Sequence, residues 1–316
     1  MDRINSFMAI GVFVALISSV ILIKYKPELF TTHLVPAAID PRPVLWWVTD
    51  NEQNSRNWAD FGARHSKKSN KGYTEVALQV ALKTQGSSFR IEVLEGRTAV
   101  LQKIQAGGGL LPALPEQLPP KLWKGWSRAT LLSTYGGLYV DGDSVLFLGP
   151  SLLPALQGVE AALFGVNPDE PRVSPTTAVA PGPAPWVGWA HRPHHPGWDL
   201  ASKEWLAVIA PGAPSYSSAI ARRVEQEIAQ EQREAGVQVL REPEGSRRSD
   251  GTNLIAEDVW GRQTDVLHFP ASVVYLAVDG EQLEKSTSLQ WALRLSPDQL
   301  RESDLVWPSL ARKALA

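Results

Sequence analysis

The stretch that most constrains the fold of this chain runs from Trp126 to Pro150 and reads WSRATLLSTYGGLYVDGDSVLFLGP. Its first part, Ser127 to Tyr135, has the apolar spacing of a short amphipathic helix. Gly136 and Gly137 then end that helix, because residues without a Cβ adopt positive φ readily. A brief apolar strand over residues 138–140 follows and leads into Asp141-Gly142-Asp143. The stretch thus predicts a helix, a glycine break and a buried strand that ends at two aspartates.

Asp141 and Asp143 place two carboxylates one residue apart, beyond the end of this buried strand. If they converge on one point, their repulsion requires a cation. Hard divalent ions such as Mn²⁺ or Mg²⁺ take oxygen ligands and commonly share them with the phosphates of a substrate. Gly142 would let a bulky group approach the backbone between them. The alternative is a solvated polar turn between two strands.

The same stretch resembles a known family motif. Arg128, Leu131-Leu132 and Tyr135-Gly136-Gly137-Leu138-Tyr139-Val140-Asp141-Gly142-Asp143 are similar to the pattern R-x-x-(L)-L-x-x-Y-G-G-(I/V)-Y-x-D-x-D. That pattern marks sugar-nucleotide glycosyltransferases with a DXD motif, namely glycosyltransferase family 32 and its capsular-polysaccharide-synthesis relatives. The resemblance implies a GT-A fold, a nucleotide-sugar donor (UDP- or GDP-), a divalent metal held through the aspartates, and transfer with retention of anomeric configuration.

The resemblance also implies roles for individual residues. Asp141 and Asp143 would hold Mn²⁺ or Mg²⁺, and Arg128 would bind the sugar or phosphate of the donor. Trp46 or Trp47, in a strand predicted over residues 44–48, would stack on the nucleotide base, with a core role as the alternative. The residues predicted to contact the donor are Tyr135, Gly136, Gly137, Tyr139, Trp46 and Trp47.

One position departs from the family pattern. The family carries an acidic residue three positions before the arginine, where it helps to hold the sugar or ribose of the donor, and here that position is Gly125. Either another residue supplies this contact or donor binding is weakened. The alternative to a hexosyltransferase is therefore a catalytically degenerate, membrane-tethered module that binds a sugar or nucleotide-sugar on the same fold.

The N-terminal part of the chain predicts a membrane anchor. Residues 7–23 carry no charge and are at the short end for a membrane-spanning helix, which suits a thin bilayer such as that of the ER or Golgi. A cleaved signal peptide is the alternative, but no A-x-A site follows the apolar run. We expect a short tail over 1–6, a single-pass anchor over 7–23, a stem linker over 24–42 and the GT-A catalytic domain over 43–316. The flanking basic residues leave the orientation in the membrane open.

The rest of the chain predicts a Rossmann-like mixed sheet flanked by helices. A strand over 44–48, a helix over 74–83 and a strand over 89–94 form a βαβ unit, which places parallel strands in one sheet. A glycine- and proline-rich loop follows the next predicted helix, over 98–105. Another strand over 161–165 and a charged amphipathic helix over 218–234 continue the alternating order.

Composition and the positions of the histidines limit which ligands and metal sites the chain is expected to have. The net charge of −2 leaves no basic surplus for binding nucleic acid. The absence of cysteine rules out thiolate metal sites and cysteine nucleophiles. His191, His194 and His195 have a spacing that disfavours a metal site, whereas His268 in a strand predicted over 265–269 is either a third metal ligand or a core residue. The expected partners are the donor, a glycan, protein or lipid acceptor, and the membrane.

Overall fold

The structure is a computed structural model that describes residues 40–49, 71–113, 115, 118–164, 187–210, 218–240, 259–261, 275–277 and 290–316. The chain divides into two compact units, Met1–Pro41 and Arg42–Ala316, and every described helix and strand belongs to the second. In chain order these elements are β1 (Val44–Thr49), α2 (Gly72–Gln85), β2 (Arg90–Glu95), α3 (Gly96–Ala106), α4 (Pro120–Tyr135), β3 (Gly137–Asp141), β4 (Val145–Phe147), η4 (Leu153–Leu156), β5 (Ala161–Phe164), β6 (Val187–Ala190), α5 (Pro196–Val208), α6 (Ser218–Glu234), β7 (Gln238–Leu240), β8 (Tyr275–Ala277), η5 (Gln290–Arg294), α9 (Pro297–Glu302) and α10 (Val306–Leu315).

The centre of the second unit is a six-stranded mixed sheet with the strand order β2-β1-β3-β6-β5-β7. β1 pairs in parallel with both β2 and β3, whereas β6 runs antiparallel to β3 and to β5. β7 is parallel to β5. β4 leaves this sheet and pairs with β8 in a separate two-stranded ribbon. The predicted α/β class, with a mixed sheet and a parallel βαβ unit, is confirmed.

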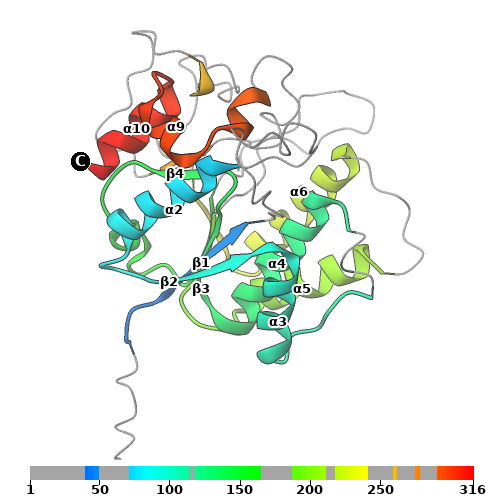
Figure 1. Ribbon diagram of the computed structural model, residues 1–316. Helices are drawn as coiled ribbons and strands as arrows, with labels where there is room; N and C mark the ends of the chain where they lie inside the picture. The colour runs from blue at the N-terminus through cyan, green and yellow to red at the C-terminus, as the bar shows by residue number, and fades with distance from the viewer. Residues whose placement is uncertain are drawn as a thin grey trace, which may run out of the picture. The chain divides into compact units, whose positions relative to one another are not determined.

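Helices cover both faces of the sheet, because side chains alternate between the faces along each strand. Leu45 and Trp47 of β1 belong to the core that also holds buried side chains of α2, α9 and α10. Trp46 and Val48, the residues between and after them, belong to the opposite core, with α3, α4, α5 and α6. In Figure 1, α3, α4 and α5 lie together on one side of β1–β3, and α2 lies on the other.

The segment before β3 differs from the sequence-based prediction. The helix expected from Ser127 instead begins at Pro120, where proline is favoured in the first turn because it has no N–H to lose. The helix α4 therefore includes Lys124 and Gly125, which the prediction assigned to no helix or strand. Its end at Gly136 agrees with the prediction, and both Gly136 (φ 67°) and Gly137 (φ 93°) adopt positive φ.

Several predictions lie outside the described residues. These are the tail over 1–6, the membrane anchor over 7–23, most of the stem over 24–42, the strand over 265–269 and its His268. Within the part of the chain that is described, no helix has the length and apolarity needed to cross a bilayer. β6 was not predicted, since its short run Val187–Ala190 is flanked by residues that carry no alternating pattern.

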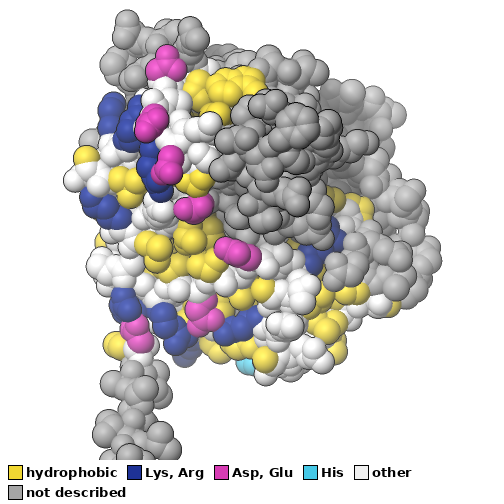
Figure 2. Space-filling view, viewed as in Figure 1, with side chains coloured by type: hydrophobic (Ala, Val, Ile, Leu, Met, Phe, Trp, Pro, Cys, Tyr) yellow, Lys and Arg dark blue, Asp and Glu magenta, His cyan; other side chains and the backbone are white. Residues whose placement is uncertain are grey.

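On the surface shown in Figure 2, basic and acidic side chains are intermixed along the edge formed by α2, α9 and α10. Arg301 and Asp298 form one ion pair there, with 2.6 Å between guanidinium nitrogen and carboxylate oxygen. Neither sign of charge dominates this edge of the described surface.

Candidate functional site

Asp141, Gly142 and Asp143 form a tight turn at the carboxyl end of β3. The backbone N–H of Gly142 donates to the carbonyl of Val48 (2.8 Å), and that of Ser144 donates to the carbonyl of Asp141 (3.0 Å). β1 has β2 on one side and β3 on the other, so the strand order reverses between β1 and β3. Open α/β sheets bind ligands at the carboxyl ends of the strands at such a reversal. The turn lies where this topology favours a binding site.

A glycine is required between the two aspartates. A Cβ added at Gly142 would lie 2.5 Å from the indole nitrogen of Trp47 and 2.9 Å from the methyl carbon of Thr49. The group that approaches the backbone here is thus the chain's own Trp47, whereas the sequence suggested a ligand. Both neighbouring side chains come from β1, so the turn is packed directly against the strand at the topological reversal.

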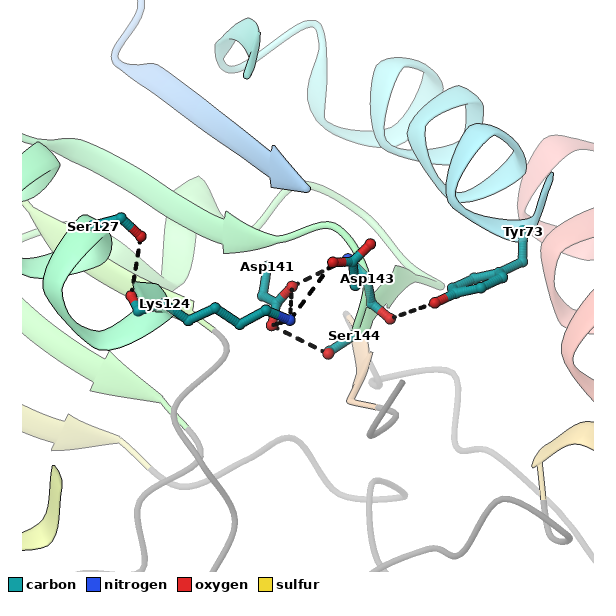
Figure 3. A network of polar contacts seen from close by, with 6 residues as sticks. All are labelled: Tyr73, Lys124, Ser127, Asp141, Asp143 and Ser144. Atoms are coloured by element: carbon teal, nitrogen blue, oxygen red, sulfur yellow. Dashed lines mark hydrogen bonds and ion pairs between the residues drawn. The ribbon is translucent and has the colours of Figure 1, made fainter. Parts of the chain in front are cut away.

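The ammonium group of Lys124 lies between the two carboxylates. Its Nζ is 3.1 Å and 2.8 Å from the two carboxylate oxygens of Asp141, and 3.6 Å from Oδ2 of Asp143. Figure 3 shows the lysine side chain extended from α4 to the turn, with Tyr73 of α2 approaching from the other side. The two aspartates do converge on one cation, and in the structure this cation is a lysine.

The carboxylate of Asp141 is fully engaged by hydrogen bonds. Besides Lys124, its Oδ1 accepts from the backbone N–H of Asp143 (3.1 Å) and its Oδ2 accepts from the hydroxyl of Ser144 (3.2 Å). The hydroxyl of Tyr73 donates to the backbone carbonyl of Asp143 (3.4 Å). These contacts fix the turn from α4 and from α2, the helices on opposite faces of the sheet.

Electrostatics keep Lys124 protonated. Burial alone would lower the pKa of Lys124, but the charges of Asp141 and Asp143 outweigh it and raise this pKa well above 10.5. Burial raises the pKa of Asp141, and Lys124 opposes that rise while Asp143 adds to it. Burial also raises the pKa of the Tyr139 hydroxyl, so this phenol stays neutral. Near neutral pH the turn therefore holds a positively charged lysine.

The side chains at the turn suit a hard divalent ion as well as an ammonium group. Asp141, Asp143 and Ser144 offer only oxygen atoms, the ligands that Mn²⁺ and Mg²⁺ prefer. The ammonium of Lys124 marks a point that both carboxylates reach. Thr49 ends β1 beside Gly142, and its buried hydroxyl has no hydrogen-bond partner among the described residues. Those residues contain no cluster of three or more His, Cys, Asp or Glu side chains that could bind a metal.

Arg128, predicted to bind the donor, is buried and paired within the protein. Its guanidinium NH2 lies 2.7 Å from a carboxylate oxygen of Glu225 in α6, and the two side chains are 5% and 12% exposed. This ion pair joins α4 to α6. Binding of a donor by Arg128 would require this ion pair to open, so donor binding stays a prediction. The role that the structure shows for Arg128 is to join the two helices.

Three residues of the motif lie far from the aspartates. Tyr135, Gly136 and Gly137 are at the amino end of β3, roughly 15 Å from the turn for a strand of this length. The indole N–H of Trp46 donates to the carbonyl of Gly136 (2.7 Å), and the hydroxyl of Tyr135 donates to that of Lys103 (2.7 Å). The strand separates these residues from the aspartates, and their contact with a donor stays a prediction.

Tyr139 and Trp47 lie nearer to the turn but inside the protein. Each side chain is 1% exposed, Tyr139 in the core with α4 and Trp47 in the core with α2. Trp46 is equally buried. Base stacking needs an open indole face, so the core role that the sequence left open for Trp46 and Trp47 is the one the structure supports. Trp47 still shapes the site, because it supports Gly142.

Packing against Trp205 explains why residue 125 is a glycine. A Cβ at this position would lie 2.3 Å from the ring carbon Cζ2 of Trp205 in α5, so any larger residue would collide with the indole. The acidic residue of the family pattern has no room here. The indole of Trp205 covers this side of α4, and the nearest charged group along the helix is that of Lys124.

Sequence reasoning missed Lys124 and Tyr73. The signal for Lys124 was its spacing of four residues from Arg128, which places both side chains on the same face of a helix. Recognising Pro120 as a helix start would have extended α4 far enough to reveal it. Tyr73 carries no such signal, because only the packing of α2 against the turn brings it there.

Two of the three neighbouring histidines, His194 and His195, have contacts within the protein. His195 caps the N-terminus of α5, where its ring nitrogen accepts from the backbone N–H of Gly197 (3.2 Å). His194 lies 3.8 Å from Asp199 and is largely exposed.

Comparison of the chain with models of known protein families, with curated proteins and with solved structures finds no match.

Proposed function

We propose that this chain is a membrane-anchored glycosyltransferase of the GT-A type. It would transfer a sugar from a UDP- or GDP-sugar to a glycan, protein or lipid acceptor, with retention of configuration. The observation that carries the proposal is the convergence of Asp141 and Asp143 on one cation, at the carboxyl end of β3 where the strand order reverses. The motif from Arg128 to Asp143 supports it.

The topology suits a nucleotide-sugar donor. A nucleotide lying across the carboxyl ends of β1 and β3 would bring its diphosphate to the Asp-Gly-Asp turn. The turn is rigid, since backbone hydrogen bonds hold Gly142 to Val48 and Ser144 to Asp141. A rigid turn holds the groups around a reacting centre in place and so lowers the entropy cost of reaching the transition state.

The proposed function includes a divalent metal. Asp141 and Asp143 would hold Mn²⁺ or Mg²⁺, which when bound neutralises the diphosphate and stabilises the leaving group. Ser144 and the backbone N–H of Asp143 orient the carboxylate of Asp141 from behind. Tyr73 holds the backbone at Asp143. The chain's own residues thus position the carboxylates, and Arg128 positions α4 against α6.

A panel of UDP- and GDP-sugars tests this function. Donor binding and hydrolysis would be measured with and without Mn²⁺, for the wild type and for the double variant Asp141→Asn, Asp143→Asn. We expect metal-dependent turnover of one donor, abolished in the double variant, because each asparagine removes a negative charge and keeps the shape. A folded wild type that binds no donor in any metal would overturn the catalytic proposal.

A second candidate is a catalytically degenerate module on the same fold, tethered to the membrane and binding a sugar or nucleotide-sugar. The observation that favours it is the occupation of the site by the protein itself. Lys124 is bound to both aspartates, Arg128 is bound to Glu225, and Trp205 covers Gly125. Metal-independent binding of a sugar, without turnover, would favour this candidate over the enzyme.

A further inference from the structure

Lys124 is held where a divalent cation would have to bind. Its Nζ contacts both oxygens of Asp141 and lies 3.6 Å from Oδ2 of Asp143. An ammonium group and a divalent metal cannot share this point, because they would repel each other and would need the same oxygen lone pairs. Any metal that uses both carboxylates therefore has to displace the lysine.

We propose that Lys124 is a built-in competitor of the divalent metal, which binds Asp141 and Asp143 only when the lysine side chain leaves them. The side chain is able to leave. It is 27% exposed, whereas those of Asp141 and Asp143 are 6% and 5% exposed. Its four-carbon stem is flexible. The carboxylate of Asp141 is held by the backbone N–H of Asp143 and the hydroxyl of Ser144, so the lysine is the partner that moves.

Exchange of Lys124 for a metal changes the charge of the site in a way that favours donor binding, a consequence that rests on the proposed function. Two carboxylates and one ammonium leave the closed site with one negative charge, which repels a diphosphate. A divalent metal in place of the ammonium neutralises the pair and releases one positive charge on a long side chain beside it. Lys124 would then be free to bind a phosphate oxygen, so metal and donor would reinforce each other's binding.

The apparent metal affinity of the wild type is reduced by the fraction of molecules in which the lysine is away from the carboxylates. Replacing Lys124 by methionine keeps an unbranched apolar stem and removes the competitor. We expect Lys124→Met to bind Mn²⁺ about tenfold or more tightly than the wild type, if the lysine is displaced in a tenth of the molecules or fewer. Lys124→Arg, which keeps a cation, is expected to bind Mn²⁺ as weakly as the wild type.

The experiment is a titration of the full-length, detergent-solubilised chain with Mn²⁺ alone, in which free Mn²⁺ is counted by electron paramagnetic resonance. The variants are Lys124→Met, Lys124→Arg and Asp141→Asn, Asp143→Asn. A tenfold gain in Lys124→Met, with no gain in Lys124→Arg and no binding in the aspartate variant, is the expected result. Equal affinity of Lys124→Met and the wild type, or no Mn²⁺ binding in either, would overturn the proposal.

A second measurement needs no variant and covers the case in which Lys124→Met does not fold. Amine-reactive labelling of the wild type, read by mass spectrometry, reports how often Lys124 is free, with Lys313 on α10 as the reference. We expect saturating Mn²⁺ to raise the labelling rate of Lys124 severalfold and to leave that of Lys313 unchanged. An unchanged rate at Lys124 would overturn the exchange. If Mn²⁺ displaces Lys124 but no donor binds, only the proposed function is overturned.

Discussion

Lys124 determines the electrostatics of the site more than any other single residue. It compensates two carboxylates that are almost fully buried, Asp141 and Asp143. Removing one partner of a buried ion pair leaves an uncompensated charge, which costs far more than the pair itself contributes. The aspartates were visible in the sequence as a motif, whereas their counter-ion could be found only by extending the preceding helix back to Pro120.

The first prediction concerns the stability of this group. Lys124→Met should lower the free energy of unfolding by about 3 kcal/mol, because both carboxylates lose their counter-ion. Adding Asp141→Asn should restore at least about 1 kcal/mol, since the two residues are directly coupled. Urea unfolding at neutral pH measures both values. A double variant that is no more stable than Lys124→Met would show that the ion pair is not the source of the loss.

The raised pKa of Lys124 gives a prediction for alkaline pH. A lysine whose pKa is higher in the folded protein than in the unfolded chain stabilises the fold fully below the unfolded pKa and loses this effect as pH rises through the folded pKa. The stability difference between wild type and Lys124→Met should therefore stay constant from neutral pH up to 10.5 and shrink only above that value. Urea unfolding across this pH range measures it, and a decline that begins near pH 8 would contradict it.

Gly125 gives the third prediction. Gly125→Ala should destabilise the protein by about 1–3 kcal/mol, because its Cβ would enter the space of the Trp205 indole and overpack the core. In the background of Trp205→Leu the same change should cost clearly less, since the ring that it collides with is gone. Thermal unfolding of the wild type, the two single variants and the double variant measures this coupling. Equal costs in both backgrounds would mean that Trp205 does not exclude a side chain here.

At the level of elements, α4 organises the site. One turn of this helix contributes Lys124 to the aspartates, and the next contributes Arg128 to Glu225 of α6. Trp123, which precedes Lys124, and Trp126, which lies midway between Lys124 and Arg128, are completely buried and fix the rotation of the helix about its axis. The packing of the helix therefore fixes the positions from which both cationic side chains start, which is why they project from a helix and not from a loop.

The fourth prediction separates the two roles of Arg128. If it mainly joins α4 to α6, Arg128→Met should cost about 3–5 kcal/mol, because it leaves Glu225 buried and unpaired. Arg192 and Glu160 form an exposed pair, 73% and 59% exposed, and are the matched control. Arg192→Met should cost under about 1 kcal/mol. Urea unfolding measures both, and a small loss for Arg128→Met with a large loss of donor binding would favour the ligand role.

The sequence was most informative about elements with regular patterns. The apolar run over residues 44–48 and the alternation over 89–94 predicted β1 and β2, and the helix between them implied their parallel pairing, which the structure has. The short strands β5 and β6 gave weaker signals, and only β5 was predicted. The predicted strand over residues 138–140 already separates Tyr135 from Asp141, whereas the register of that strand in the sheet depends on tertiary packing and could not be read from the pattern.

At the level of the whole molecule, one binding position follows from the order of the strands. The reversal between β1 and β3 brings Thr49 and Asp141 to the same edge, and α2 and α4 reach this edge from opposite faces with Tyr73 and Lys124. Sequence reasoning identified the aspartates from a motif of neighbouring residues. It could not identify the helices that meet there, because these contacts join residues far apart in the chain.

The division of the chain into Met1–Pro41 and Arg42–Ala316 gives the fifth prediction. A chain that starts at Arg42 should unfold at the same temperature as the full-length protein, because the described core lies entirely in the second unit. It should also lose sedimentation with membranes, if residues 7–23 are the anchor. Circular dichroism and membrane fractionation measure the two outcomes. A truncated chain that fails to fold, or that still sediments with membranes, would contradict this account.

The central claim is that Asp141 and Asp143 form an exchangeable cation site, and diffraction from crystals grown with and without Mn²⁺ tests it most directly. With saturating Mn²⁺ we expect an anomalous peak between the two carboxylates and the ammonium of Lys124 displaced from both. Without the metal, Lys124 should lie between them. Crystals in saturating Mn²⁺ that show no peak at this point, with Lys124 still in contact with Asp141, would contradict the claim.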